Sequence, residues 1–137
     1  MKKRRNPNVF SLPKVYRFNR EAETNLQLIP HQELEALRTG NGSEQSFHTL
    51  AARLNVGLVC FQRYWKDDMD NILLMDSALN SLVAVRERFE RTGKWGVSGD
   101  ELKYIGTGLN LTDEAQLNLT RRDFGAALEY VLKVASY

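Results

Sequence analysis

Apolar residues recur every three or four positions along the chain from residue 47 onward, the spacing of a helix with one buried face. The first such face consists of seven apolar residues: Phe47, Leu50, Ala51, Leu54, Leu58, Phe61 and Trp65. Ser43 stands before it as a candidate N-cap. Gly57 interrupts the face, and its missing side chain predicts that a neighbouring helix approaches closely there.

A second helix is predicted after Asp67, Asp68 and Asp70, whose charges suit a helix N-terminus. Gly93 ends it, because glycine readily adopts the left-handed conformation found after helices. The residues predicted to point inward are Ile72, Met75, Leu79, Leu82, Val83 and Phe89. Those predicted to point mostly outward are Arg86, Glu87, Arg88, Glu90 and Arg91.

Two further helices complete the pattern. Ser98 and Glu101 form an S-x-x-E capping box at the start of the first, and Thr120 opens the second. The first carries Leu102, Ile105, Leu109 and Leu119 on one face. The second is predicted to bury Phe124, Ala127, Leu128, Val131, Leu132 and Ala135. No segment alternates apolar and polar residues as a strand would.

The first 29 residues show no helical period and contain Pro7 and Pro13, so they predict an extended arm. Pro30 suits the first position of a short helix over His31–Leu37. We therefore expect an all-α protein: a compact bundle of about four main helices with an extended basic N-terminal arm. The predicted division is an arm over residues 1–29 and one helical domain over residues 30–137.

Charge divides the chain unevenly. The first twenty residues have no acid and seven basic residues, which are Lys2, Lys3, Arg4, Arg5, Lys14, Arg17 and Arg20. The other 117 residues hold 12 basic and 17 acidic side chains. Cations follow a phosphate backbone, and the interleaved Phe10, Tyr16 and Phe18 could stack on unpaired bases. The arm thus predicts binding to nucleic acid or a nucleoprotein. The alternative is a solubilising tip with three aromatic side chains packed on the body.

Two other features suggest contacts with partners. Arg121 and Arg122 occupy the first turn of the last helix, where they could bind a phosphate or a carboxylate, or be solvated and offset by Asp123. Trp95 lies in a glycine-flanked joint. It is either an exposed interface anchor or a plug that closes one end of the bundle.

Catalytic and metal-binding patterns are not found in the sequence. His31 and His48 are seventeen residues apart without a nearby second ligand, and the aspartates after residue 66 lack the spacing of a calcium loop. Cys60 is the single cysteine and is expected to be buried. Apolar runs are too short for a membrane span, and no secretory signal is recognisable. We expect a cytoplasmic, non-enzymatic protein without a metal, a cofactor or a membrane partner.

The run Arg91–Leu102 resembles a joint found in small proteins encoded in proteobacterial prophages and mobile elements, which also begin with a Lys/Arg tract. The segment Leu109–Leu128 resembles their last part. That family is uncharacterised, so the resemblance implies a mobile-element origin and no activity. Two hypotheses follow: an accessory protein that binds nucleic acid through its arm, or a helical module whose acidic body binds, and so inhibits or regulates, a host protein complex.

Overall fold

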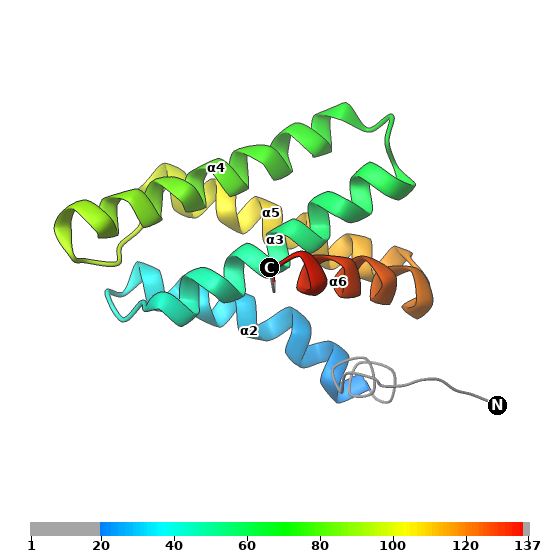
Figure 1. Ribbon diagram of the computed structural model, residues 1–137, viewed down its shortest axis with the longest axis horizontal. Helices are drawn as coiled ribbons and strands as arrows, with labels where there is room; N and C mark the ends of the chain where they lie inside the picture. Colours follow the sequence, from blue (N-terminus) through cyan, green and yellow to red (C-terminus); the bar gives the residue numbers. More distant parts are fainter. Residues whose placement is uncertain (1–19, 136–137) are drawn as a thin grey trace.

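The computed structural model describes residues 20–135, with side chains from residue 24 to residue 134. This part of the chain is entirely helical and contains no strand, which confirms the all-α prediction. Its helices, in chain order, are α2 (Arg20–Arg38), α3 (Glu44–Tyr64), α4 (Met69–Thr92), α5 (Gly99–Asn118) and α6 (Arg121–Ala135) (Figure 1). None of them is long and apolar enough to cross a membrane.

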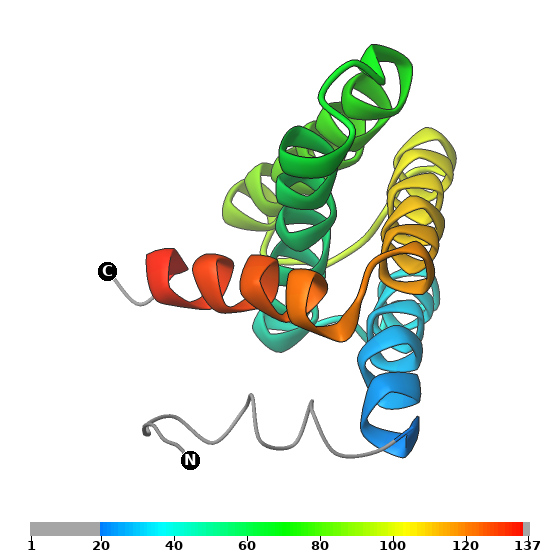
Figure 2. The same ribbon diagram turned by 90° about the vertical axis from the view of Figure 1, so that its right-hand side faces the viewer.

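Helix α3 lies at the centre of the bundle and packs against each of the other four helices. Helices α4 and α5 pack on α3 and on each other, whereas α6 runs across α3 (Figure 2). The core accordingly draws on every described helix. Its largest fully buried side chains include Leu37, Leu50, Met75, Leu109 and Phe124.

The predicted helix ends are confirmed by their hydrogen bonds. Ser43 and Ser98 each cap a helix through a reciprocal capping box, the second of them with Glu101. The Asp68 carboxylate accepts the Asn71 backbone N–H at the start of α4, and Gly93 ends α4 with a φ of 76°. Thr120 Oγ1 accepts the Asp123 backbone N–H at the start of α6. Local polar residues therefore define where these helices begin and end.

The N-terminal prediction is wrong for residues 20–29, which belong to α2 instead of an extended arm. Pro30 lies inside this helix, where the missing N–H removes one backbone hydrogen bond. The helix persists because Pro30, Leu34 and Leu37 are buried and Leu26 packs against the core. The leading helix is thus 19 residues long and not short. Residues 1–19 lie outside the described part.

Glycines allow the central helices to approach closely, as the position of Gly57 predicted. A Cβ atom at Gly57 would clash with the side chain of Thr112 on α5. A Cβ atom at Gly108 would lie 2.6 Å from Ala78 Cβ and 2.7 Å from Leu54 Cδ2. Both glycines are buried, and together they bring α3, α4 and α5 into close contact.

We predict that Gly108→Ala lowers the free energy of unfolding by about 1–3 kcal/mol, because Ala78 Cβ can move only with its backbone. The control is Gly99→Ala, where an added Cβ meets no atom within 4 Å and should leave stability unchanged or slightly higher. Urea unfolding followed by circular dichroism measures both variants. Equal stability of the two variants would contradict the close packing described above.

Candidate interaction surface on helix α4

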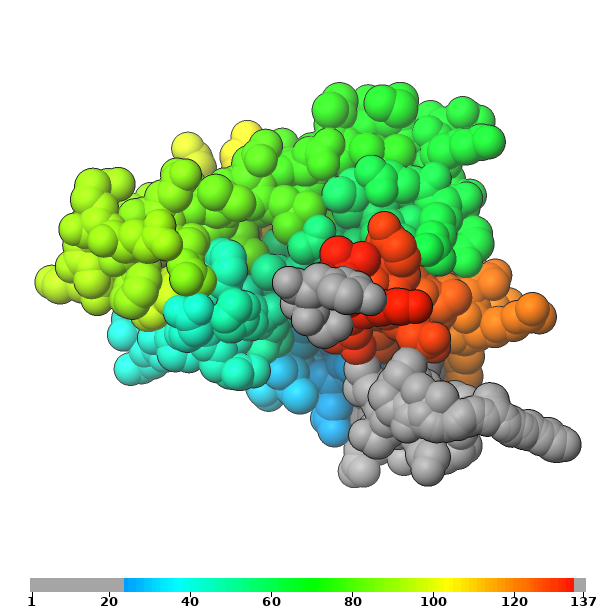
Figure 3. Space-filling model, in the orientation of Figure 1, coloured from blue at the N-terminus to red at the C-terminus, as the bar shows by residue number. Residues whose placement is uncertain are grey.

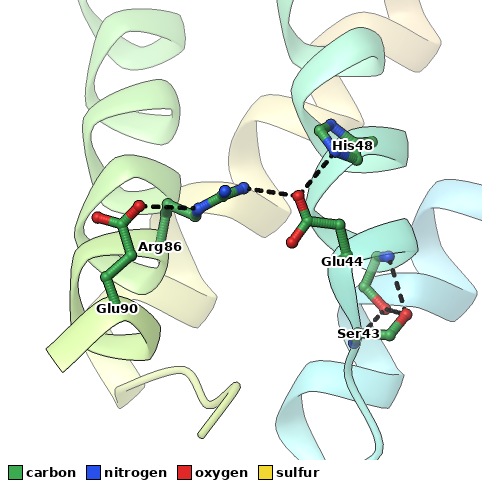
Figure 4. A network of polar contacts seen from close by, with 6 residues as sticks. Ser43, Glu44, His48, Arg86 and Glu90 are labelled. Carbon is green, nitrogen blue, oxygen red and sulfur yellow. Dashed lines mark hydrogen bonds and ion pairs between the residues drawn. The ribbon is translucent and has the colours of Figure 1, made fainter. Parts of the chain in front are cut away.

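Two arginines of α4 point sideways into ion pairs with neighbouring helices. Arg86 Nη1 donates to Glu44 Oε2 of α3 at 3.0 Å, and Arg86 Nε donates to Glu90 Oε2 at 3.4 Å (Figure 4). The same Glu44 oxygen lies 3.0 Å from His48 Nε2. The guanidinium carbon of Arg86 also lies 5.0 Å from the ring centre of Phe47. These contacts hold Arg86 against α3.

Arg88 leaves the opposite flank of α4 and binds α5. Its Nη1 and Nη2 donate to the two carboxylate oxygens of Glu101 at 3.0 and 2.6 Å, and Nη1 also donates to the Gly96 carbonyl at 3.2 Å. The hydrogen bonds from Arg88 hold the pKa of Glu101 below its usual range, against burial, which raises it. The pair links α4, the joint before α5 and the first turn of α5.

The sequence analysis placed both arginines mostly outward, and the structure corrects this. Arg86 and Arg88 are only about one-third exposed, with side-chain exposures of 31% and 32%. They are two positions apart, which separates their directions by about 200° around a helix. One therefore points towards α3 and the other towards α5. Glu87, between them, points to solvent.

The remaining outward positions of α4 form one continuous stripe, which we term the α4 outer face. Its members are spaced by four and three residues in alternation and are all exposed: Met69, Leu73, Asp76, Asn80, Val83, Glu87 and Glu90. The apolar members Met69, Leu73 and Val83 are 56%, 57% and 49% exposed. Val83 was predicted to point inward, so that prediction is wrong.

The exposed charges on this side of α4 are acidic as far as Glu90, which is paired with Arg86, and Arg91 follows one turn after Glu87. Asp70, beside the stripe, is exposed like Asp76, Glu87 and Glu90, and the first exposed cation along α4 is Arg91. Helix α4 forms the upper edge of the molecule, and within the described residues it contacts only α3 and α5 (Figure 3). The α4 outer face is therefore apolar and acidic, and no described helix covers it.

Most of the residues predicted to bind partners fall elsewhere. The structure does not describe Lys2, Lys3, Arg4, Arg5, Lys14, Arg17, Phe10, Tyr16 or Phe18. Arg20 begins α2, and its side chain is also outside the described part. Arg121 and Arg122 are both exposed in the first turn of α6, as predicted. They lie on a different helix from the α4 outer face.

Trp95 is half-buried between α3 and α4, the packing expected of a plug. Its ring stacks on Phe89 with centroids 4.0 Å apart and planes at 8°, and Phe47 lies on the same cluster at 6.0 Å from Trp95. Arg86 lies over this cluster, 5.8 Å from the Trp95 ring centre. The aromatic stack and the Arg86 ion pairs thus stabilise the same end of the α3–α4 contact.

The other reactive side chains take part in packing. Burial raises the pKa of Cys60 to about 12, which fits its predicted role as a small buried apolar group. His31 Nε2 lies 2.8 Å from Asp113 Oδ2, and Arg53 Nη2 donates to Asp113 Oδ1 at 2.8 Å. In residues 20–135 no three His, Cys, Asp or Glu side chains gather as a metal site would require.

Sequence reasoning missed the α4 outer face, because its apolar members Met69, Leu73 and Val83 are separated by the polar Asp76 and Asn80 and form no continuous apolar period. The chain itself matches no known protein family, no characterised protein and no solved structure. The candidate surface therefore depends on the geometry of this chain alone.

We predict that Glu101→Gln lowers the free energy of unfolding by about 1–2 kcal/mol at neutral pH, because it removes the charge that Arg88 pairs with. The pKa of Glu101 is lowered in the folded state, so its contribution is present above the unfolded pKa, about 4.3, and is lost as pH falls through the folded value. Urea unfolding at several pH values should show the two proteins converging in acid. A constant difference would contradict this role of Glu101.

Proposed function

We propose that this protein is a helical interaction module whose α4 outer face binds a basic, amphipathic helix of a partner protein. The observation that supports the proposal is the combination of three half-exposed apolar side chains with an excess of exposed acids, on a side of α4 that no described helix covers. A surface of that kind favours a ligand with apolar groups on one side and Lys or Arg beside them. No catalytic step is required.

The spacing of the stripe is compatible with a helical partner. Positions that alternate by four and three residues stay in line with a second helix packed along the first. From Met69 to Glu90 the stripe covers about 32 Å of helix at about 1.5 Å per residue. A matching partner places apolar residues opposite Met69, Leu73 and Val83, and basic residues opposite Asp76 and Glu87.

The expected affinity is modest. Each of the three apolar side chains is already half-buried, so complete burial adds about 1 kcal/mol per residue. Exposed ion pairs contribute about 0.2–1 kcal/mol each and are weakened by salt. Such a face suits transient, regulated contacts. The resemblance to mobile-element proteins extends the proposal to a host regulatory or defence complex as the partner's source.

We predict that Leu73→Ser weakens binding of a designed peptide of about 21 residues, with leucines at 3.5-residue spacing and lysines elsewhere, by about 5- to 20-fold. Fluorescence anisotropy of the labelled peptide measures the dissociation constant. The matched control is Leu117→Ser on α5, since Leu117 is 79% exposed and lies on a different helix. Equal effects of the two substitutions would refute α4 as the binding face.

Nucleic-acid binding through the N-terminal arm is a second candidate function. A specific arrangement favours it: α2 and α6 begin at the same end of the bundle (Figures 1 and 2). The exposed Arg121 and Arg122 therefore lie at the end of the molecule where α2 begins, and the chain before α2 contains six basic residues. Cations from both could contact one stretch of phosphate backbone.

For this candidate we predict that replacing Lys2, Lys3, Arg4 and Arg5 with alanine weakens binding to a random single-stranded oligonucleotide. The slope of log affinity against log salt concentration should fall by about 3, at about 0.7 for each phosphate that the arm no longer neutralises. A double substitution at two exposed body lysines, Lys94→Gln and Lys103→Gln, serves as the control. An unchanged slope for the arm variant would contradict nucleic-acid binding through the arm.

A further inference from the structure

We infer that the α4 outer face of the free protein is occupied by the chain's own basic N-terminal segment, residues 2–18. This inference rests on the proposed function, because it assigns an internal occupant to the surface that binds the partner. It makes the segment a built-in competitor of that partner. Two features support it: charge and position.

Charge complementarity is the first feature. Residues 2–18 contain six basic residues and no acid, and their apolar members include Phe10, Tyr16 and Phe18. The α4 outer face offers apolar side chains of its own beside Asp76, Glu87 and Glu90. Each of the two surfaces thus combines apolar side chains with charges opposite to those of the other. Contacts of this composition bring the two together at low salt and lose strength as salt is added.

Position is the second feature. Helix α2 runs antiparallel to α5, since His31 contacts Asp113 and Leu34 lies near Gly106. Helix α4 also runs antiparallel to α5, since Arg88 binds Glu101 and Ala78 lies against Gly108. The first residues of α2 and of α4 therefore lie at the same end of the bundle (Figure 1). The segment joins the body at the end where Met69 and Leu73 begin the stripe.

The segment is long enough to reach the face. Its seventeen residues span up to about 56 Å when extended, at about 3.3 Å per residue. The path from α2 to the far side of α4 passes the layer formed by α3 and α5 and then α4 itself, and each helix is about 10 Å across. A path around the end of the bundle is thus well within the length of the chain. Pro7 and Pro13 suit an extended segment of this kind.

The inference is tested on the full chain with a nitroxide label attached through Ser11→Cys. Cys60 has no exposed surface, so the label attaches only to the new cysteine. Amide signals of residues 69–87 should lose most of their intensity through paramagnetic relaxation at about 0.05 M salt and recover it at about 0.5 M salt. Chemical reduction of the label gives the reference spectrum.

Two variants make the result specific. Asp76→Asn with Glu87→Gln should abolish the loss of α4 signal, whereas Asp100→Asn with Glu114→Gln, two exposed acids of α5, should preserve it. Strongest broadening on α2 or α6, or no broadening, overturns the inference. Broadening that arises only from contact between a labelled chain and a second, unlabelled chain also overturns it, because the inferred contact lies within one chain. The label experiment uses no peptide, so a negative result there does not affect the peptide-binding result. Conversely, if the peptide does not bind, the label still reports where the segment lies.

Discussion

The orientation of α4 about its own axis, set by its buried apolar face and by the ion pairs on its two flanks, determines what the molecule presents to its surroundings. Arg86 is bound to Glu44 of α3 and Arg88 to Glu101 of α5, so α4 is held at one rotation about its own axis. A rotation by one residue, about 100°, would break both pairs and expose Met75 and Leu82. With that rotation fixed, Glu87 and the half-exposed Leu73 and Val83 face solvent. The mixed charges of α4 are thus separated into a mainly acidic outer face and two flanks on which the arginines are paired.

Much of the fold could be predicted because its signals are local. Ser43, Ser98, Thr120 and Gly93 act within a few residues of themselves, and they define the helix ends that the structure confirms. Helix α2 was misjudged for the opposite reason. Pro30 imposes a local cost that is evident in the sequence, while the burial of Leu34 and Leu37 that offsets it comes from α3 and α5.

The candidate surface depends on contacts between residues that are distant in sequence, which the sequence pattern does not specify. Arg86 pairs with a carboxylate 42 residues away and Arg88 with one 13 residues away. From the sequence alone, both arginines are expected to be solvated, and they are expected to neutralise the acids next to them on α4. The wrong prediction for Val83 has the same cause. In a sequence, an apolar residue beside a buried face is assigned to that face only because it is apolar. Only the packing of α3 and α5 against α4 separates the buried Val85 from the exposed Val83.

The modest strength of the α4 outer face is what makes an internal occupant effective. A tethered segment acts at an effective concentration in the range of about 1 mM, so even a weak contact is well populated. A partner helix must then exceed that contact, and its apparent affinity falls in proportion to the occupied fraction. On the proposed arrangement, a polyanion that bound the basic segment would remove it from α4 and raise the affinity for the partner. By linkage, the partner raises the affinity for the polyanion to the same extent. On this arrangement the two candidate functions are coupled states of one protein, because they compete for the same basic segment.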